Sequence, residues 1–228
     1  IKVEQFQRDH HWFGAYRFSF STNGINYHEE KVQQFILKNK EHLSIGITID
    51  GTEMKHDLNR VYKASGRGSY KDVVRNIPLW LSQFPDASTK VTISSADIPY
   101  IKESVLHLYA LGIHEVNINC VFEDVWKAGD DRLFEEQLLM LADAIIDKNK
   151  LRPFLTLDRC TQSTQECIDC EVASGCAWCQ GENYDAADTS TIYQRSTAIC
   201  KMHKARVRAN NYYWNRLLRK MESEGEPC

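Results

Sequence analysis

Over the first 150 residues, strand-like segments take turns with amphipathic, helix-like segments. Strands that are each followed by a helix pair in parallel through right-handed crossovers, which gives a doubly wound sheet or part of a (β/α) barrel. The sequence therefore predicts an α/β fold. The predicted strands are residues 16–24, 43–51, 90–94 and 114–122, and the predicted helices are residues 29–39, 70–84, 97–111 and 131–148.

Polar residues follow each predicted strand, at the edge where α/β folds bind their ligands. Any one of them can instead form a turn or cap a helix, as Asp97 is expected to do for the third helix, with Pro99 in its first turn. Their shared position at one rim favours a ligand site. The rim residues are Ser21, Thr22 and Asn23, then Thr48, Asp50 and Gly51, then Ser94 and Ser95, and finally Asn117, Asn119 and Glu123.

The composition excludes several classes of function. The chain has 228 residues, of which 43% are hydrophobic, enough for a buried core. A net charge of −3 gives no general attraction for nucleic acid or anionic lipid, and the basic run at 201–220 is interpreted as the solvated face of a helix. No apolar run approaches the ~20 residues that cross a bilayer, and no signal peptide precedes Ile1. We expect a cytoplasmic protein without a nucleic-acid or membrane partner, and the start at Ile1 suggests a piece of a longer chain.

The character of the sequence changes after residue 150, where the periodicity ends and cysteines gather. The predicted domains are therefore residues 1–152 and 153–228. In a reducing compartment, clustered thiols are metal ligands more often than disulfides. Two cysteines, Cys120 and Cys228, stand apart, while six lie within 41 positions: Cys160, Cys167, Cys170, Cys176, Cys179 and Cys200.

The spacing of these cysteines discriminates between metals. Only five residues separate Cys170 from Cys176, whereas the two knuckles of a zinc ribbon need a hairpin of roughly 12–20 residues between them. A cubane cluster accepts a wider spread of sulfur ligands on loops. The spacing favours an iron–sulfur cluster over zinc, and both alternatives stay open at this point.

Several segments resemble radical S-adenosylmethionine (SAM) enzymes of the peptide-modifying group, from about residue 16 to residue 217. The cysteine-rich stretch, with the helix after it, is similar to the auxiliary-cluster domain of that group, called SPASM. Within that group, the chain resembles maturases that introduce thioether crosslinks into ribosomally made peptides with repeated cysteine motifs. The segments are STNG (21–24), TIDGTEMKHDLNR (48–60), GRGSYKDVVRNI (66–77), LYALGIHEVNIN (108–119), CIDCEVASGCAWC (167–179) and ICKMHKARVRANNYYW (199–214).

The resemblance implies a partial (β/α)6 barrel, followed by a small cysteine-rich SPASM-like domain and a C-terminal helix. In the family, a CxxxCxxC loop holds a [4Fe–4S] cluster that chelates SAM, and cleavage of SAM yields a 5′-deoxyadenosyl radical that abstracts hydrogen from the peptide. Neither CxxxCxxC nor the family's Gly-Gly-Glu-Pro stretch occurs in this chain. The resemblance therefore implies the C-terminal portion of such an enzyme, an oxidoreductase that is not competent alone.

Site residues carried over from the resemblance fall into two groups, and no catalytic residue is among them. Thr48 and Arg60 are expected to contact the carboxylate or ribose of SAM, and Asn23 and Asp50 complete this cofactor-binding set, although Asp50 can instead cap the turn at Gly51. The predicted metal ligands are Cys167, Cys170, Cys176 and Cys200 for one complete auxiliary [4Fe–4S] cluster, Cys179 for another cluster, and Cys160 as a poor match. Cys120 is interpreted as a core thiol.

Three functions follow from these observations. The first is modification of a Cys-rich precursor peptide, with electrons from a donor such as ferredoxin or flavodoxin. The second is a non-catalytic peptide-binding module stabilised by zinc or an iron–sulfur cluster. The third, a barrel hydrolase using Asp50, Glu123 and Asp124 as acid and base, leaves the cysteines unexplained.

Overall fold

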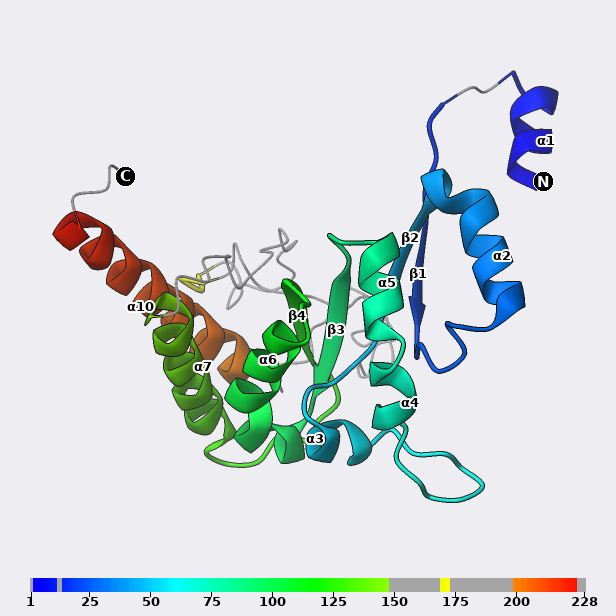
Figure 1. Cartoon of the computed structure of the whole chain (residues 1–228). Coiled ribbons are helices and arrows are strands. Elements are labelled where there is room, and N and C mark those ends of the chain that lie inside the picture. Colours follow the sequence, from blue (N-terminus) through cyan, green and yellow to red (C-terminus); the bar gives the residue numbers. More distant parts are fainter. Residues whose placement is uncertain (1, 12–13, 148–168, 173–198, 225–228) are drawn as a thin grey trace, which may run out of the picture.

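The computed structural model describes residues 2–11, 14–147, 169–172 and 199–224. Strands and helices alternate along the chain as predicted (Figure 1). The elements are α1 (Lys2–Asp9), β1 (Phe18–Thr22), α2 (Glu30–Asn39), η1 (Lys40–His42), β2 (Leu43–Ile47), α3 (Glu53–Asp57), α4 (Tyr70–Val74), α5 (Ile77–Gln83), β3 (Ser88–Ile93), η2 (Ser95–Tyr100), α6 (Ile101–Ala110), β4 (Glu115–Cys120), α7 (Asp130–Asp147) and α10 (Cys200–Glu224).

The four strands form two parallel pairs. β1 pairs with β2, with Phe18 opposite Leu43, and β3 pairs with β4, with Ser88 opposite Glu115. Parallel pairing through helical crossovers is the arrangement that the alternating pattern predicted. The fold class α/β is thus confirmed at the level of mixed helices and small parallel sheets. The partial (β/α)6 barrel and the division into domains at residues 152 and 153 stay predictions, since that boundary lies outside the described residues.

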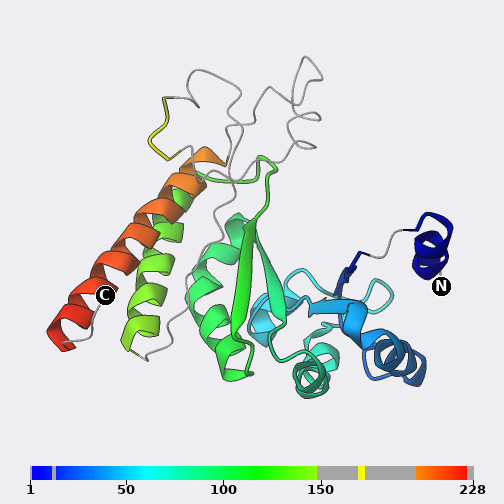
Figure 2. The ribbon, with the colours of Figure 1, turned by 90° about the horizontal axis from the view of Figure 1, so that it is seen from above.

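Helices cover one side of these strands. In both views α6, α7 and α10 lie on the same side of β3 and β4, and α7 and α10 run side by side (Figures 1 and 2). The core between helices and strands is apolar, and each fully buried large side chain contributes about 2–3 kcal/mol. Among the described helices, none is long and apolar enough to cross a membrane. The largest buried core side chains include Trp80, Phe134, Tyr213, Ile47, Ile93 and Leu108.

Two helix predictions were wrong in detail. The helix predicted over 70–84 is broken into α4 and α5, because Pro78 cannot donate a backbone hydrogen bond and Asn76 turns its amide to Gly24 O (2.8 Å) and Ile25 O (3.0 Å).

Asp97 is not the cap of its helix. A 3-10 turn, η2, precedes α6, so the helical segment begins at Ser95 and its cap residue is Ser94, three residues before the predicted cap. The Asp97 carboxylate accepts from the backbone N of Ser94 (2.7 Å), and the Ser94 side chain accepts from the backbone N of Asp97, which together form a capping box. Ser94 Oγ also donates to the carboxylate at 2.8 Å.

The seam between β2 and β3 is closed by side chains, because these neighbouring strands belong to separate hydrogen-bonded pairs. Thr89 Oγ1 donates to Ile47 O (2.6 Å) and accepts from Ile49 N (3.2 Å), and Trp80 Nε1 donates to Ile45 O (2.7 Å). A side chain at Gly46 would place its Cβ 3.0 Å from Ser88 O, so the glycine allows the close approach of the strands. Thr89 and Trp80 thus satisfy backbone groups that a ladder would otherwise pair.

Replacing Thr89 by Val should lower the free energy of unfolding by about 3 kcal/mol, because it leaves Ile47 O and Ile49 N buried without these partners. Urea unfolding of the two chains measures this difference. Thr92→Val is the matched control. The side chain of Thr92 is exposed, and only its backbone N–H and C=O form hydrogen bonds at the seam. We therefore expect the free energy of unfolding to change by less than about 0.5 kcal/mol. Equal losses in both variants would contradict the role of the Thr89 hydroxyl.

Candidate functional site

One face of the paired strands is polar. Along β2 the buried residues Leu43, Ile45 and Ile47 alternate with half-buried Ser44 and Gly46. Parallel sheets in α/β proteins are usually apolar on both faces, because both are covered. This alternation therefore marks the second face as one that meets a polar ligand or solvent. From the strand registers, the residues on it are Ser19, Ser21, Ser44, Gly46, Ser88, Lys90, Thr92, Glu115, Asn117 and Asn119.

A hollow lies on this polar face, over the seam between β2 and β3. Gly46, which lacks a side chain, and Thr48, directly after β2, belong to its wall, and Lys90 carries the one charge among its lining residues. A ligand with hydrogen-bonding groups and negative charge fits such a lining. The hollow is lined by Ser19, Phe20, Ser21, Ser44, Ile45, Gly46, Ile47, Thr48, Ser88 and Lys90.

Some of the predicted rim residues serve turns. Thr22 Oγ1 accepts from Gly24 N and Asn23 Oδ1 accepts from Ile25 N, both at 3.2 Å. Gly24 has φ +71°, and a Cβ there would lie 2.7 Å from Ile47 Cγ2, so this turn requires glycine. Asn23 therefore has a structural role in the turn after β1, and contact with a cofactor stays a prediction for it.

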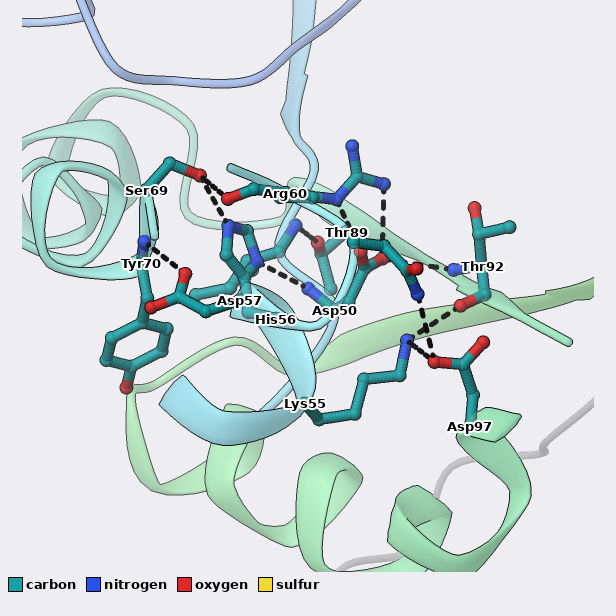
Figure 3. A network of polar contacts seen from close by, with 12 residues as sticks. Asp50, Lys55, His56, Asp57, Arg60, Ser69, Tyr70, Thr89, Thr92 and Asp97 are labelled. Carbon is teal, nitrogen blue, oxygen red and sulfur yellow. Dashed lines mark hydrogen bonds and ion pairs between the residues drawn. The ribbon is translucent and has the colours of Figure 1, made fainter. Parts of the chain in front are cut away.

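Asp50 and Arg60 form an ion pair at the carboxyl end of β2 (Figure 3). Arg60 Nε donates to Asp50 Oδ2, and Nη2 donates to Oδ1 at 3.3 Å. Asp50 is 2% exposed, and its Oδ1 also accepts from Thr92 N (3.1 Å) across the seam. The side chain of Arg60 is 31% exposed, and Nη1 points away from Asp50 (Figure 3). The pair joins two of the predicted site residues and leaves one end of the guanidinium toward solvent.

A buried lysine completes the seam beside this pair. Lys55 Nζ lies 2.8 Å from Thr92 O and 3.2 Å from Asp97 Oδ1, and both side chains are at most 3% exposed. Asn59 Nδ2 donates to the same oxygen of Asp97 at 3.3 Å. A buried charge requires such a partner, since desolvation without one costs several kcal/mol. No sequence signal pointed to this role for Lys55, because it stands in a polar segment without a distinctive pattern.

His56 is buried at the centre of the network. Its Nδ1 accepts from Asp50 N (3.1 Å), so Nε2 carries the proton and donates to Ser69 Oγ (3.1 Å), which in turn donates to Arg60 O (2.9 Å). Burial, the largest cause, lowers the pKa of His56 from 6.5 to about 4. The ring is therefore neutral near pH 7 and connects the strand end, the loop and the arginine.

Asp57 fixes the far end of the same loop. Its Oδ1 accepts from Tyr70 N at 2.9 Å, and a Cβ on Gly68 would lie 1.9 Å from its Oδ2, so a side chain at residue 68 would displace this carboxylate. His56, Asp57 and Gly68 lie within segments 48–60 and 66–77, which the sequence analysis used only to establish the family resemblance. In the structure, the hydrogen bonds of His56 and Asp57 hold the loop that carries Arg60 close to Asp50.

The cysteines divide between described and undescribed residues. Cys170 and Cys200 are described and half-buried, whereas Cys160, Cys167, Cys176 and Cys179 lie outside the described residues. Within the described part of the chain, no three His, Cys, Asp or Glu side chains are grouped as a metal site. Cys120 packs against the core, and burial raises its pKa to about 12, which agrees with a core thiol.

No family model matches this sequence, and no curated protein matches it. Solved structures do. "Native anSMEcpe with bound AdoMet and Cp18Cys peptide" matches at a TM-score of 0.69 and 15% identity, over 97% of this chain and 81% of that chain. "Native anSMEcpe with bound AdoMet" matches at 0.71 and 14%, over 97% and 79%. The chain thus shares its fold with a protein solved with bound AdoMet and peptide, and at this identity the likeness confirms the resemblance seen in the sequence at the level of the fold alone.

Acidification should destabilise the protein through His56. Its pKa is about 4 in the folded chain against 6.5 ordinarily, so the unfolded chain takes up the proton first and the free energy of unfolding decreases from about pH 6.5 down to about pH 4. With about 1.4 kcal/mol for each pH unit between the two values, the loss is on the order of 3 kcal/mol.

Urea unfolding at a series of pH values measures this loss, and comparison with His56→Asn isolates it from other titrating groups. The Asn variant should be less stable at pH 7.5 and should show a shallower decline toward pH 4. His114, which is exposed, provides the control His114→Asn. A wild-type curve parallel to that of His56→Asn would show that His56 does not titrate as described.

Proposed function

We propose that this chain is the C-terminal portion of a radical SAM enzyme that modifies a ribosomally made peptide, with the peptide and SAM meeting at the polar face of β1–β4. The observation that carries the proposal is the polar face of the two parallel strand pairs, of which β3 and β4 pack their other face under helices (Figures 1 and 2), in a fold shared with a protein that was solved with AdoMet and a peptide. A thioether or related crosslink in a Cys-rich peptide is the modification that the sequence resemblance favours.

Arg60 is the proposed contact for the carboxylate of SAM. A guanidinium binds a carboxylate through parallel N–H donors, and Arg60 has Nη1 directed away from its buried partner Asp50 (Figure 3). Asp50 keeps the side chain in one orientation, which lowers the entropy lost when a ligand binds. Thr48, half-buried at the hollow, is the proposed hydroxyl contact beside it.

Cys170 and Cys200 are proposed to bind the auxiliary [4Fe–4S] group together with cysteines outside the described residues. They fit as ligands, because both are half-buried and the segment of Cys170 is hydrogen-bonded to the helix that begins at Cys200. Cys120 does not fit, since burial raises its pKa and disfavours the thiolate that binds metal. When bound, such a group supplies an anchor for the peptide or a path for electrons.

The second function is a metal-stabilised peptide-binding module without catalysis, which the half-buried thiols Cys170 and Cys200 and the polar strand face support equally. This module would bind its peptide at the same polar face as the radical enzyme, but it would not bind SAM, and its metal can be zinc instead of iron. The hydrolase has little support, because its candidate Asp50 is buried and paired with Arg60 and Thr92 N, and therefore is not a free acid or base.

Metal analysis after anaerobic reconstitution with iron and sulfide separates the first two functions. We expect about four irons per auxiliary cluster, with absorbance near 400 nm, and loss of both in Cys170→Ser. Zinc in place of iron, with no colour, would support the binding module instead. A wild-type chain that binds neither metal would contradict both.

Titration calorimetry with SAM on the reconstituted chain tests Arg60. Arg60→Met should weaken SAM binding by about 10- to 100-fold, because a charged hydrogen bond contributes about 1.5–3 kcal/mol. Arg75→Met, on an exposed arginine beside Asp72, is the matched control and should bind SAM like the wild type. Thermal melting verifies that each variant is folded. A folded Arg60→Met chain with wild-type affinity would remove Arg60 from the site.

A further inference from the structure

The N-terminal turns of α10 carry a buried histidine whose two ring nitrogens are both engaged. His203 is 6% exposed. Arg206 Nη2 lies 2.9 Å from His203 Nδ1, and His203 Nε2 lies 3.3 Å from Val172 O. A guanidinium only donates, so Nδ1 is the acceptor and the proton is on Nε2, which donates to the carbonyl. Arg206 thus selects the tautomer that binds Val172.

This hydrogen bond joins the two segments that carry the described thiols of the cysteine-rich part. Cys170 precedes Val172 by two residues, which span at most about 7 Å, and Cys200 precedes His203 by three helical residues, a rise of about 4.5 Å. Both thiols are therefore held in one neighbourhood by a contact between segments about thirty residues apart in the sequence.

The surroundings of His203 make this contact rigid. Ile199 and Met202, on either side of Cys200, are buried in the main core, and Ala205 is fully buried one turn further on. The start of α10 is thus fixed to the core of the protein, and the segment of Val172, which is hydrogen-bonded to it, is held in place by the same contacts. A histidine with both nitrogens in hydrogen bonds has none left for a metal, so His203 is not itself a ligand.

We propose that His203, oriented by Arg206, is a positioning residue that holds Cys170 beside Cys200 so that both can bind one metal group. The inference rests on one part of the proposed function, namely that Cys170 and Cys200 bind a metal group. It assigns no catalytic role to His203. Residues behind a ligand that fix its orientation typically change metal affinity by 10–100-fold.

Two substitutions at His203 separate hydrogen bonding from packing. Gln retains an acceptor for Arg206 and a donor for Val172 O, whereas Leu fills similar space with neither. After anaerobic reconstitution with iron and sulfide, His203→Leu should retain metal at least 10-fold less tightly against a chelator than the wild type, and His203→Gln should recover most of that loss. Iron is measured per folded monomer, with folding followed by near-ultraviolet circular dichroism.

Arg208→Met is the matched control on the same helix. Arg208 bonds Glu135 of α7 through three contacts between 2.6 and 3.0 Å, so its loss weakens helix docking away from the thiols. We expect a lower melting temperature with unchanged metal retention. If His203→Leu does not fold, Arg206→Met removes only the outer hydrogen bond, and we expect a smaller loss of metal retention with a shifted reduction potential.

Three outcomes overturn the inference while the proposed function stands. They are wild-type metal retention in folded His203→Leu, equal losses in His203→Leu and His203→Gln, or unchanged retention and potential in Arg206→Met. Zinc in the wild-type chain would contradict the radical enzyme but leave the positioning role to be measured with zinc. A wild-type chain that retains no metal overturns both.

Discussion

The structure depends on the seam between β2 and β3, where side chains replace a backbone ladder. Thr89 and Trp80 satisfy the groups of β2 that face the seam, while Asp50 and Lys55 bind the N–H and C=O of Thr92 on β3. Each is buried, so each unsatisfied partner would cost about 1–3 kcal/mol. Thr89 and Asp50 thus join the two strand pairs directly, while Trp80 attaches β2 to α5 and Lys55 attaches β3 to α3.

The same seam builds the candidate site. One carboxylate oxygen of Asp50 accepts from the backbone of β3, and both oxygens accept from Arg60. The position of the exposed guanidinium is therefore set by the position of the strands. His56 and Asp57 secure the loop that returns Arg60 to this place. A ligand bound at Arg60 would therefore meet a group whose orientation is fixed by the core, and the hollow beside Gly46 lies on the same seam.

Local sequence patterns predicted the helices and strands well, but they could not predict contacts between residues that are distant in the sequence. Strand and helix periods repeat within a few residues, and all four strands and the helices that follow them formed. The break at Asn76 depends on carbonyls of residues 24 and 25, and the pairing of Lys55 with Asp97 spans more than forty residues. Ser94 was missed as a cap because Asp97 is an equally good cap residue by type.

By itself, the sequence determined the α/β class and the set of cysteines, because periodicity and residue type are properties of the chain alone. It also carried the resemblance that the shared fold confirmed. Only the tertiary structure decided that Asp50 holds Arg60, that His56 is neutral, and that His203 reaches Val172. These depend on burial and on which distant groups meet, and both arise only when the helices and strands are packed together.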